Sequence, residues 1–302
     1  MDIERLSIWL DRVDPYGYSR LMALKSIYIA IVLFIANLFL RPPMASLVML
    51  IAGAGIIIIE LPSINTFKKK DTIYLAYIIL VSLTIALFAA YVYIPSLFIL
   101  FAACWCYILY SLISKNPALF PIGSVILMLG LISLKGYNSG NFYLILNELI
   151  FFAEFAVIVF WAHKLFPNFY YKVWHKATIL SIETMQNMLK NQHSAESRTL
   201  FKHYYQAKNV LPLLTKFPQI RQMVAITNWL SYYHYYLADL LSTSSSDRGL
   251  LATLEHDLQI LLWAFKNGKK LPKLAFACLE DGELSSHQLI FSKIRHKWNK
   301  LC

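Results

Sequence analysis

The chain has 302 residues, of which 58% are hydrophobic and 15% are charged, and its mean hydropathy is +0.52. This apolar share exceeds that of soluble globular domains, and the net charge of +11 is uneven: residues 1–166 hold 11 Lys and Arg against 8 Asp and Glu, whereas residues 167–302 hold 17 against 9. These totals exclude a single soluble domain and predict a membrane domain followed by a basic soluble domain.

Residues 1–20 form the first predicted segment, a short amphipathic helix that ends at Pro15 and Gly17. We expect it either to lie on the membrane surface or to pack on the soluble domain. A cleavable signal peptide is disfavoured, because the segment is long and acidic and no clear small-residue cleavage site follows. Its apolar residues at helical spacing are Ile3, Leu6, Trp9, Leu10 and Val13.

Six apolar runs follow in residues 21–166, and each predicts a transmembrane helix. A helix needs about 20 apolar residues to cross a bilayer, so the fifth run is short for a full span. Small residues at 52–55, and Gly123 and Gly130 seven residues apart, indicate close helix packing or, alternatively, backbone that lines a substrate path. The runs are 21–40, 44–61, 72–90, 94–113, 119–134 and 142–166.

The orientation follows from the Lys and Arg residues that flank the runs, which gather on the cytoplasmic side of membrane proteins. Only Arg41 and Lys135 fall on one side, so that side is predicted to be outside, and both termini are predicted to be cytoplasmic. These two outer cations either attract an anion to a pore or are ordinary exposed charges. The opposite side holds Arg5, Arg12, Arg20, Lys68, Lys69, Lys70, Lys115, Lys164, Lys172 and Lys176.

The sixth run carries two carboxylates, Glu148 and Glu154, although a charge near the middle of a span costs roughly 2.5–3.5 kcal/mol. Asn147 and Trp161 lie seven residues either side of Glu154, so the three form one stripe, which we expect to face other helices or a water-filled path. Glu154 is either a proton-coupling acid or an acid that pairs with a base to hold the bundle. Glu148, about 9 Å nearer the outer face, is a second station or an interfacial residue.

From residue 167 the apolar residues become periodic, which predicts a helical bundle in the cytosol at 167–302. Helices are expected over 174–189, 195–207, 219–241 and 251–265, with a last one from Ser285. The third of these helices carries an aromatic stripe, which is typical of a core or of a dimer face. The stripe consists of Trp229, Tyr232, Tyr233 and Tyr236.

Motifs for chemistry are missing from the sequence: it has no P-loop, no GxSxG and no HExxH spacing. The four cysteines, Cys104, Cys106, Cys278 and Cys302, include no CxxC pair, which argues against a zinc site or a disulfide framework. We therefore expect no enzyme activity, no cofactor and no metal. The basic C-terminal half lacks a nucleic-acid module, so we expect its charge to be attracted to anionic lipid headgroups and not to nucleic acid.

Three segments stand out: residues 18–25 (YSRLMALK), residues 41–45 (RPPMA) and the Lys68–Lys70 link, set in a single six-helix unit with a helical cytosolic tail. Together they resemble the aromatic acid exporter (fusaric acid resistance, FUSC-like) superfamily. The resemblance implies proton-driven export of aromatic carboxylic acids. With one six-helix unit in the chain, it also implies a homodimer or pairing with a second membrane subunit.

The sequence therefore predicts a multi-pass transporter subunit of the bacterial inner membrane that exports a small organic, aromatic anion with the proton gradient. Glu154 is expected to carry the proton, while Asn147, Trp161 and Glu148 line the pathway. Two alternatives stay open. One is a passive anion channel with the same layout, and the other is a non-transporting membrane scaffold whose basic bundle binds a partner.

Overall fold

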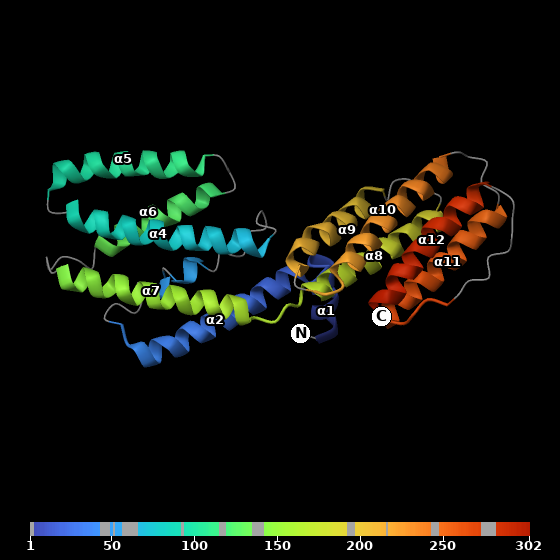
Figure 1. Ribbon diagram of the computed structural model, residues 1–302, viewed down its shortest axis with the longest axis horizontal. Helices are drawn as coiled ribbons and strands as arrows, with labels where there is room; N and C mark the ends of the chain where they lie inside the picture. Colours follow the sequence, from blue (N-terminus) through green and yellow to red (C-terminus); the bar gives the residue numbers. More distant parts are fainter. Residues whose placement is uncertain are drawn as a thin grey trace. The chain divides into compact units, whose positions relative to one another are not determined.

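The computed structural model describes residues 3–42, 49–50, 52–55, 66–91, 94–114, 119–134, 142–191, 197–215, 217–242, 248–272 and 282–302. Every regular element within these ranges is a helix (Figure 1). The chain divides into two compact units, which we call the apolar unit, Arg20–Pro167, and the polar unit, Met1–Ser19 with Asn168–Cys302. Each unit is described separately below.

Most of the apolar unit consists of long hydrophobic helices. Four of them are long and apolar enough to cross a membrane, namely α2 (Tyr18–Leu40), α4 (Phe67–Tyr91), α5 (Pro95–Ile113) and α7 (Phe142–Leu165). Six spans were predicted. The fifth run forms α6 (Phe120–Leu134), whose 15 residues fall short of the usual span, and the second run, 44–61, lies mostly outside the described residues.

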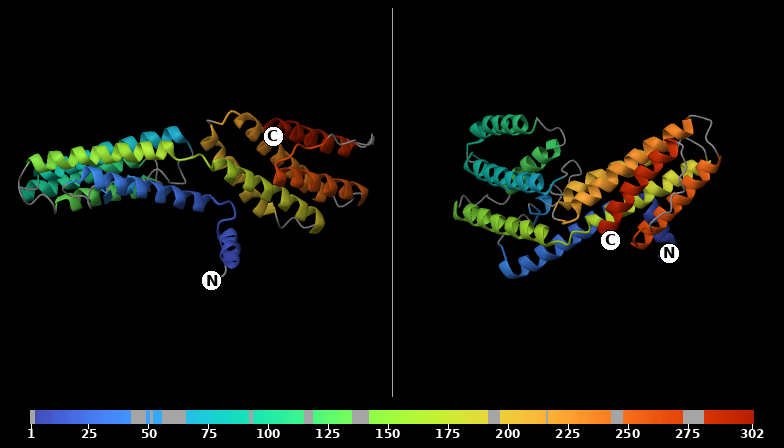
Figure 2. Two further views of the ribbon diagram at one scale, coloured as in Figure 1. Left: turned by 90° about the horizontal axis from the view of Figure 1, so that it is seen from below. Right: turned by 45° about the vertical axis from the view of Figure 1, so that its right-hand side comes forward.

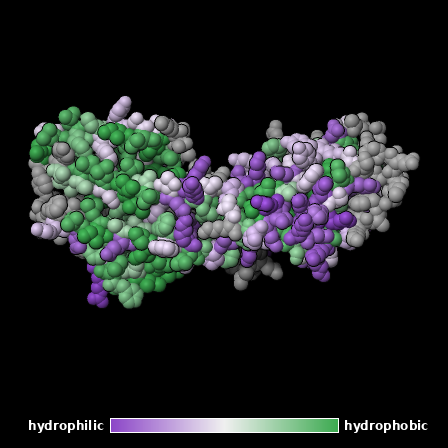
Figure 3. All heavy atoms as spheres, viewed as in Figure 1, coloured by the Kyte–Doolittle hydropathy of each residue, from purple (hydrophilic) through white to green (hydrophobic). Residues whose placement is uncertain are grey.

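The helices of the apolar unit pack closely around small and apolar side chains. A Cβ added at Gly130 of α6 would lie 2.6 Å from Cγ2 of Thr84 in α4, so glycine allows the two helices to approach at this point. Thr84 also accepts a hydrogen bond from Nε1 of Trp105 in α5, at 3.0 Å. Apolar side chains cover much of the outer surface as well, which appears green in Figure 3. Among the described residues, the exterior of this unit is therefore mostly apolar, unlike the exterior of a water-soluble protein.

The polar unit has the opposite pattern, with a buried apolar core and a surface rich in charges, which appears purple in Figure 3. Helix α8 packs against α9 and α11, while α10 packs against α12 (Figure 2). In the core, the rings of Phe265 and Trp298 stack with their centroids 3.7 Å apart. The helices are α1 (Ile3–Val13), α8 (Tyr170–Asn191), α9 (Ser197–Val210), the 3-10 turn η3 (Leu211–Leu214), α10 (Ile220–Ser242), α11 (Arg248–Asn267) and α12 (Gly282–Leu301).

The N-terminal segment belongs to the polar unit. Lys176 in α8 forms an ion pair with Asp11 in α1 at 3.0 Å. The hydroxyl of Tyr16 hydrogen-bonds Nδ1 of His203 in α9 at 2.9 Å. Of the two positions expected for this amphipathic helix, packing on the C-terminal helices is the one these contacts describe.

The aromatic stripe of α10 is only partly a core feature. Tyr233 is fully buried, Trp229 and Tyr236 are half-buried, and Tyr232 is 65% exposed. Helix α10 has 23 residues and turns more than one face toward its neighbours, so part of its aromatic stripe points outward.

The last helix also differs from expectation, because α12 begins at Gly282, three residues before Ser285.

Candidate functional site

A groove lies between α4 and α7 in the apolar unit. Its volume is about 320 Å³. Thr66 helps to set where α4 begins, because its hydroxyl accepts a hydrogen bond from the backbone N–H of Lys69 at 3.3 Å, as an N-cap residue does. This start places Asp71 in the second turn, at one end of the groove. The groove is lined by Asp71, Thr72, Tyr74, Leu75 and Ile78 of α4 and by Ala156, Val157 and Phe160 of α7.

The walls of the groove are aromatic and apolar. The rings of Tyr74 and Phe160, which both contribute to the lining, stack with their centroids 6.3 Å apart and their planes 11° from parallel. The Tyr74 hydroxyl donates a hydrogen bond to the carbonyl oxygen of Ala156 at 2.9 Å, which ties α4 to α7. Such walls suit a flat apolar ligand, because aromatic faces and aliphatic side chains pack against it without needing polar partners.

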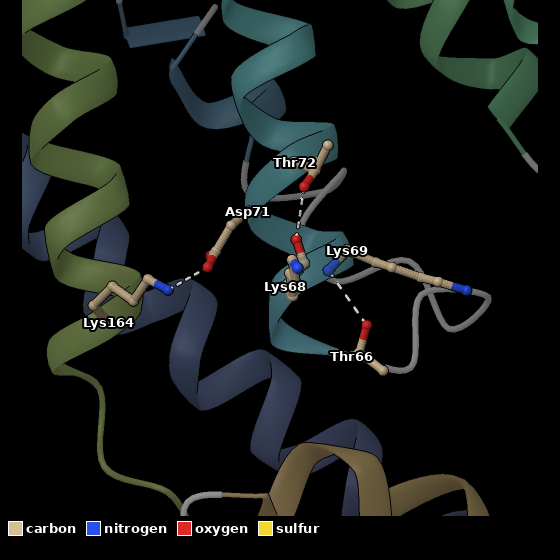
Figure 4. Close-up of polar contacts among 6 residues, drawn as sticks. All are labelled: Thr66, Lys68, Lys69, Asp71, Thr72 and Lys164. Atoms are coloured by element: carbon tan, nitrogen blue, oxygen red, sulfur yellow. Dashed lines mark hydrogen bonds and ion pairs between the residues drawn. The ribbon is translucent and has the colours of Figure 1, made fainter.

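An ion pair between Asp71, which lines the groove, and Lys164 joins α4 to α7 (Figure 4). Oδ2 of Asp71 accepts from Nζ of Lys164, and the same Nζ lies 5.2 Å from the ring centroid of Phe160. Oδ1 of Asp71 is buried and has no hydrogen-bond partner within the described part of the chain. The carboxylate is therefore only half satisfied, although burying an unpaired acceptor costs about 1–3 kcal/mol.

The same end of the apolar unit collects positive charge, and we call it the basic end. The start of α2, the start of α4 and the end of α7 meet there. Phe166 contacts Lys25, whose Nζ lies 5.9 Å from the ring centroid, while the rings of Phe67 and His163 are 6.2 Å apart. Lys25 and Lys70 are almost fully buried. Among the described residues of the apolar unit, the carboxylate at this end is Asp71. The described cations of the basic end are Arg20, Lys25, Lys68, Lys69, Lys70 and Lys164.

The stripe predicted on the sixth run lies on an exposed face of α7. Asn147 and Glu154 are exposed, and Trp161 is 58% exposed. Val157, which lines the groove, lies between Glu154 and Trp161 on the same face, so the stripe borders the groove. Within this chain, the described helices leave that face uncovered.

The remaining predicted residues lie elsewhere. Glu148 is 5% exposed, and no hydrogen bond or ion pair of its carboxylate is found among the described residues. Arg41 is exposed just after the end of α2, with φ of 46° and its N–H bonded to the Asn37 carbonyl oxygen at 3.1 Å, as in an αL helix cap. Lys135 falls outside the described residues. Arg41 is not among the residues that line the groove, and the structure does not describe the position of Lys135.

Asp71 and Lys164 were not singled out as a site from the sequence. A signal was nevertheless present, since an acid at the start of the third run and a base at the end of the sixth lie on the same predicted side of the membrane. What the sequence lacks is the information that α4 and α7 are neighbours. In the described ranges, no three His, Cys, Asp or Glu side chains gather where they would hold a metal ion.

Comparison with known proteins gives no family. No family model matches the chain, and neither a curated protein nor a solved structure matches it.

Proposed function

We propose that the chain is a transporter subunit of the bacterial inner membrane that exports an aromatic organic anion in exchange for protons, as a homodimer or with a second membrane subunit. The observation that carries the proposal is the groove between α4 and α7. It combines aromatic walls with a positively charged end, and it borders a carboxylate that lies in the middle of a candidate span. The aromatic walls and the positive end suit an aromatic anion, and the carboxylate in the middle of the span suits proton coupling.

The spacing along α7 supports a path into the membrane. Lys164 follows Glu154 by ten residues, a rise of about 15 Å along the helix. This rise is about half of the roughly 30 Å hydrocarbon core, and the groove lining on α7 runs from Phe160 to Ala156, two residues from Glu154. On this proposal the anion enters at the basic end, and Glu154 takes up and releases the proton near the middle of the membrane.

The exposed stripe supports the association of subunits. Lipid does not solvate the carboxylate of Glu154 or the amide of Asn147, since a charge at this depth costs roughly 2.5–3.5 kcal/mol. A second subunit would cover the two side chains together with Trp161. Buried Glu148 would act as a further proton station toward the outer side, where Arg41 and Lys135 would attract anions.

Vesicle transport tests the proposal. The chain is reconstituted into liposomes, and radiolabelled benzoate flux is measured with and without a pH gradient for the wild type and Glu154→Gln. A matched control is Glu255→Gln, which removes a carboxylate from the polar unit. We expect Glu154→Gln to lose the flux that depends on the pH gradient while the protein still assembles, and Glu255→Gln to keep it.

Two other outcomes would contradict the proposal. Passive benzoate flux that is undiminished in Glu154→Gln would identify an anion channel with the same layout. A wild-type chain that assembles in the vesicles but moves no benzoate under either condition would identify a membrane scaffold whose basic C-terminal half binds a partner.

A further inference from the structure

Lys164 is placed to meet a ligand at the head of the groove. It lies in the last turn of α7, and its Nζ contacts both the carboxylate of Asp71 and the ring face of Phe160. Both contacts line the groove, so a ligand that fills the groove comes next to this ammonium group. A cation above an aromatic face beside an apolar slot suits a carboxylate attached to a flat apolar body.

Asp71 is an incomplete partner for Lys164. The ion pair uses only Oδ2, while Oδ1 is buried without a hydrogen-bond partner in the described part of the chain. The two side chains keep 26% and 28% of their surface exposed, so a solute can reach the pair. A partly buried ion pair stabilises a fold well only if its remaining lone pairs are also satisfied, and here one oxygen is not. A ligand carboxylate that takes the place of Asp71 beside Lys164 removes the one hydrogen bond that Asp71 Oδ2 makes to Lys164, and the 28% exposed Asp71 side chain stays accessible to water.

The surrounding charge favours an incoming anion. Lys68, Lys69 and Lys70 directly precede Asp71, and the described cations of the basic end outnumber its described carboxylate. Figure 4 shows Asp71 and Lys164 directed toward each other while the side chain of Lys69 extends away from them. The described charges of the basic end therefore sum to a positive value even when Asp71 is ionised, and a positive field raises the local concentration of anions.

We propose that Lys164 binds the carboxylate of a small aromatic acid at the head of the groove, and that Asp71 is a resting counterion which this carboxylate displaces. The ring of the ligand lies between Tyr74 and the aliphatic wall formed by Leu75 and Val157. A volume of about 320 Å³ lies at the small end of ligand sites, which favours a single-ring acid. This inference rests on the proposed function for the class of ligand, and it adds the residues that select the anion.

The two partners of the ion pair are expected to change binding in opposite directions. Equilibrium binding of radiolabelled benzoate is measured on the whole chain in nanodiscs of neutral phosphatidylcholine. Asp71→Asn removes the competing carboxylate, and we expect it to tighten benzoate binding by roughly three- to tenfold. Lys164→Gln removes the binding cation, and we expect it to weaken binding by at least about tenfold.

Matched variants separate binding from folding. Lys164→Arg keeps the charge and should bind benzoate within about threefold of the wild type. Lys69→Gln removes a neighbouring exposed lysine that is directed away from the pair, so it should weaken binding far less than Lys164→Gln. The thermal midpoint of every variant is recorded without ligand. If Asp71→Asn and Lys164→Gln weaken binding equally, the pair is a structural brace and the proposal is wrong, as it also is if the wild type binds no benzoate.

Two further readouts identify how the proposal fails. Proton-coupled flux in the wild type without tighter binding by Asp71→Asn rejects the displacement but leaves the proposed function standing. Tighter binding by Asp71→Asn in a chain without flux rejects the function but leaves the site standing. Native mass spectrometry from nanodiscs with phosphatidylglycerol tests whether Lys164 binds a lipid headgroup and not the carboxylate of a small acid. If this lipid stays on the wild type, leaves Lys164→Gln and is not displaced by benzoate, the site holds a lipid headgroup and the proposal is overturned.

Discussion

The two units of the chain are both helical, but they distribute apolar side chains in opposite ways. In the polar unit the large apolar side chains gather inside, around Trp174, Phe265 and Trp298. In the apolar unit they also cover the outside, as Ile31 of α2 and Leu100 of α5 do, with 53% and 64% of their surface exposed. Burial by the chain itself therefore stabilises one unit, whereas the other needs a nonaqueous environment around it. A polar group in the apolar unit, such as Glu154 or the Asp71–Lys164 pair, is costly to place in such an environment and is therefore a candidate functional group.

The largest expected difference between the two units comes from replacing one tryptophan in each by alanine. Trp298 is 1% exposed, stacks on Phe265 and donates from Nε1 to the Lys269 carbonyl oxygen at 2.8 Å. We expect Trp298→Ala to lower the free energy of unfolding of the polar unit by about 3–5 kcal/mol, because it leaves a cavity. Trp161→Ala, at a 58% exposed position of α7 in the apolar unit, should change the free energy of unfolding of its own unit by less than about 0.5 kcal/mol in the isolated chain. Denaturant unfolding followed by far-UV circular dichroism measures both, and equal losses would contradict the contrast.

A lysine placed on each exposed surface tests the outer faces. Ile31→Lys puts a charge on the exposed side of α2, where we expect membrane insertion to become less favourable by roughly 2.5–3.5 kcal/mol. Ala252→Lys, on the exposed side of α11, should change stability by no more than about 0.5 kcal/mol. Insertion is measured by the fraction of chain that resists extraction from membranes. An Ile31→Lys chain that inserts as well as the wild type would show that this face does not meet lipid.

Mild acid should weaken the polar unit through its histidines. Burial lowers the pKa of His175, His203 and His234 below their usual value of 6.5. Below that pH the unfolded chain binds more protons than the folded unit, so the free energy of unfolding falls as the pH falls. We expect a lower thermal midpoint at about pH 5.5 than at about pH 7.5. His175→Phe keeps a ring stacked near Trp298 and should make this pH dependence shallower; an unchanged or steeper dependence would contradict the account.

The smallest effect is expected at the surface ion pair of the polar unit. Lys176 and Asp11 keep 41% and 56% of their side-chain surface exposed, so water already solvates both charges. Lys176→Ala should cost less than about 1 kcal/mol, and the cost should shrink further in high salt. Denaturant unfolding at low and high salt measures it. A larger loss that is insensitive to salt would mean that α1 is held to α8 more tightly than an exposed pair allows.

The sequence predicted the helices well, but it did not predict the Asp71–Lys164 pair. Apolar run length and periodicity are local properties, so the run 142–166 and the segment 219–241 correspond to α7, Phe142–Leu165, and α10, Ile220–Ser242. The Asp71–Lys164 pair joins residues 93 apart and depends on which helices are neighbours. The periodicity of apolar residues does not show which helices are neighbours. For the same reason the spacing of Asn147, Glu154 and Trp161 identified a shared face of α7, but not that this face is exposed in the chain.

The environment of the apolar unit is tested most directly by cysteine labelling in nanodiscs. In a background where the four native cysteines are replaced by serine, single cysteines are placed at Ile31, Leu100 and Ala252 and exposed to a water-soluble maleimide. We predict rapid labelling at residue 252 and protection at residues 31 and 100 until the lipid is removed, since the thiolate reacts only where water reaches it. Equally fast labelling at all three positions would show that water, and not lipid, surrounds the apolar unit, and the account would be wrong.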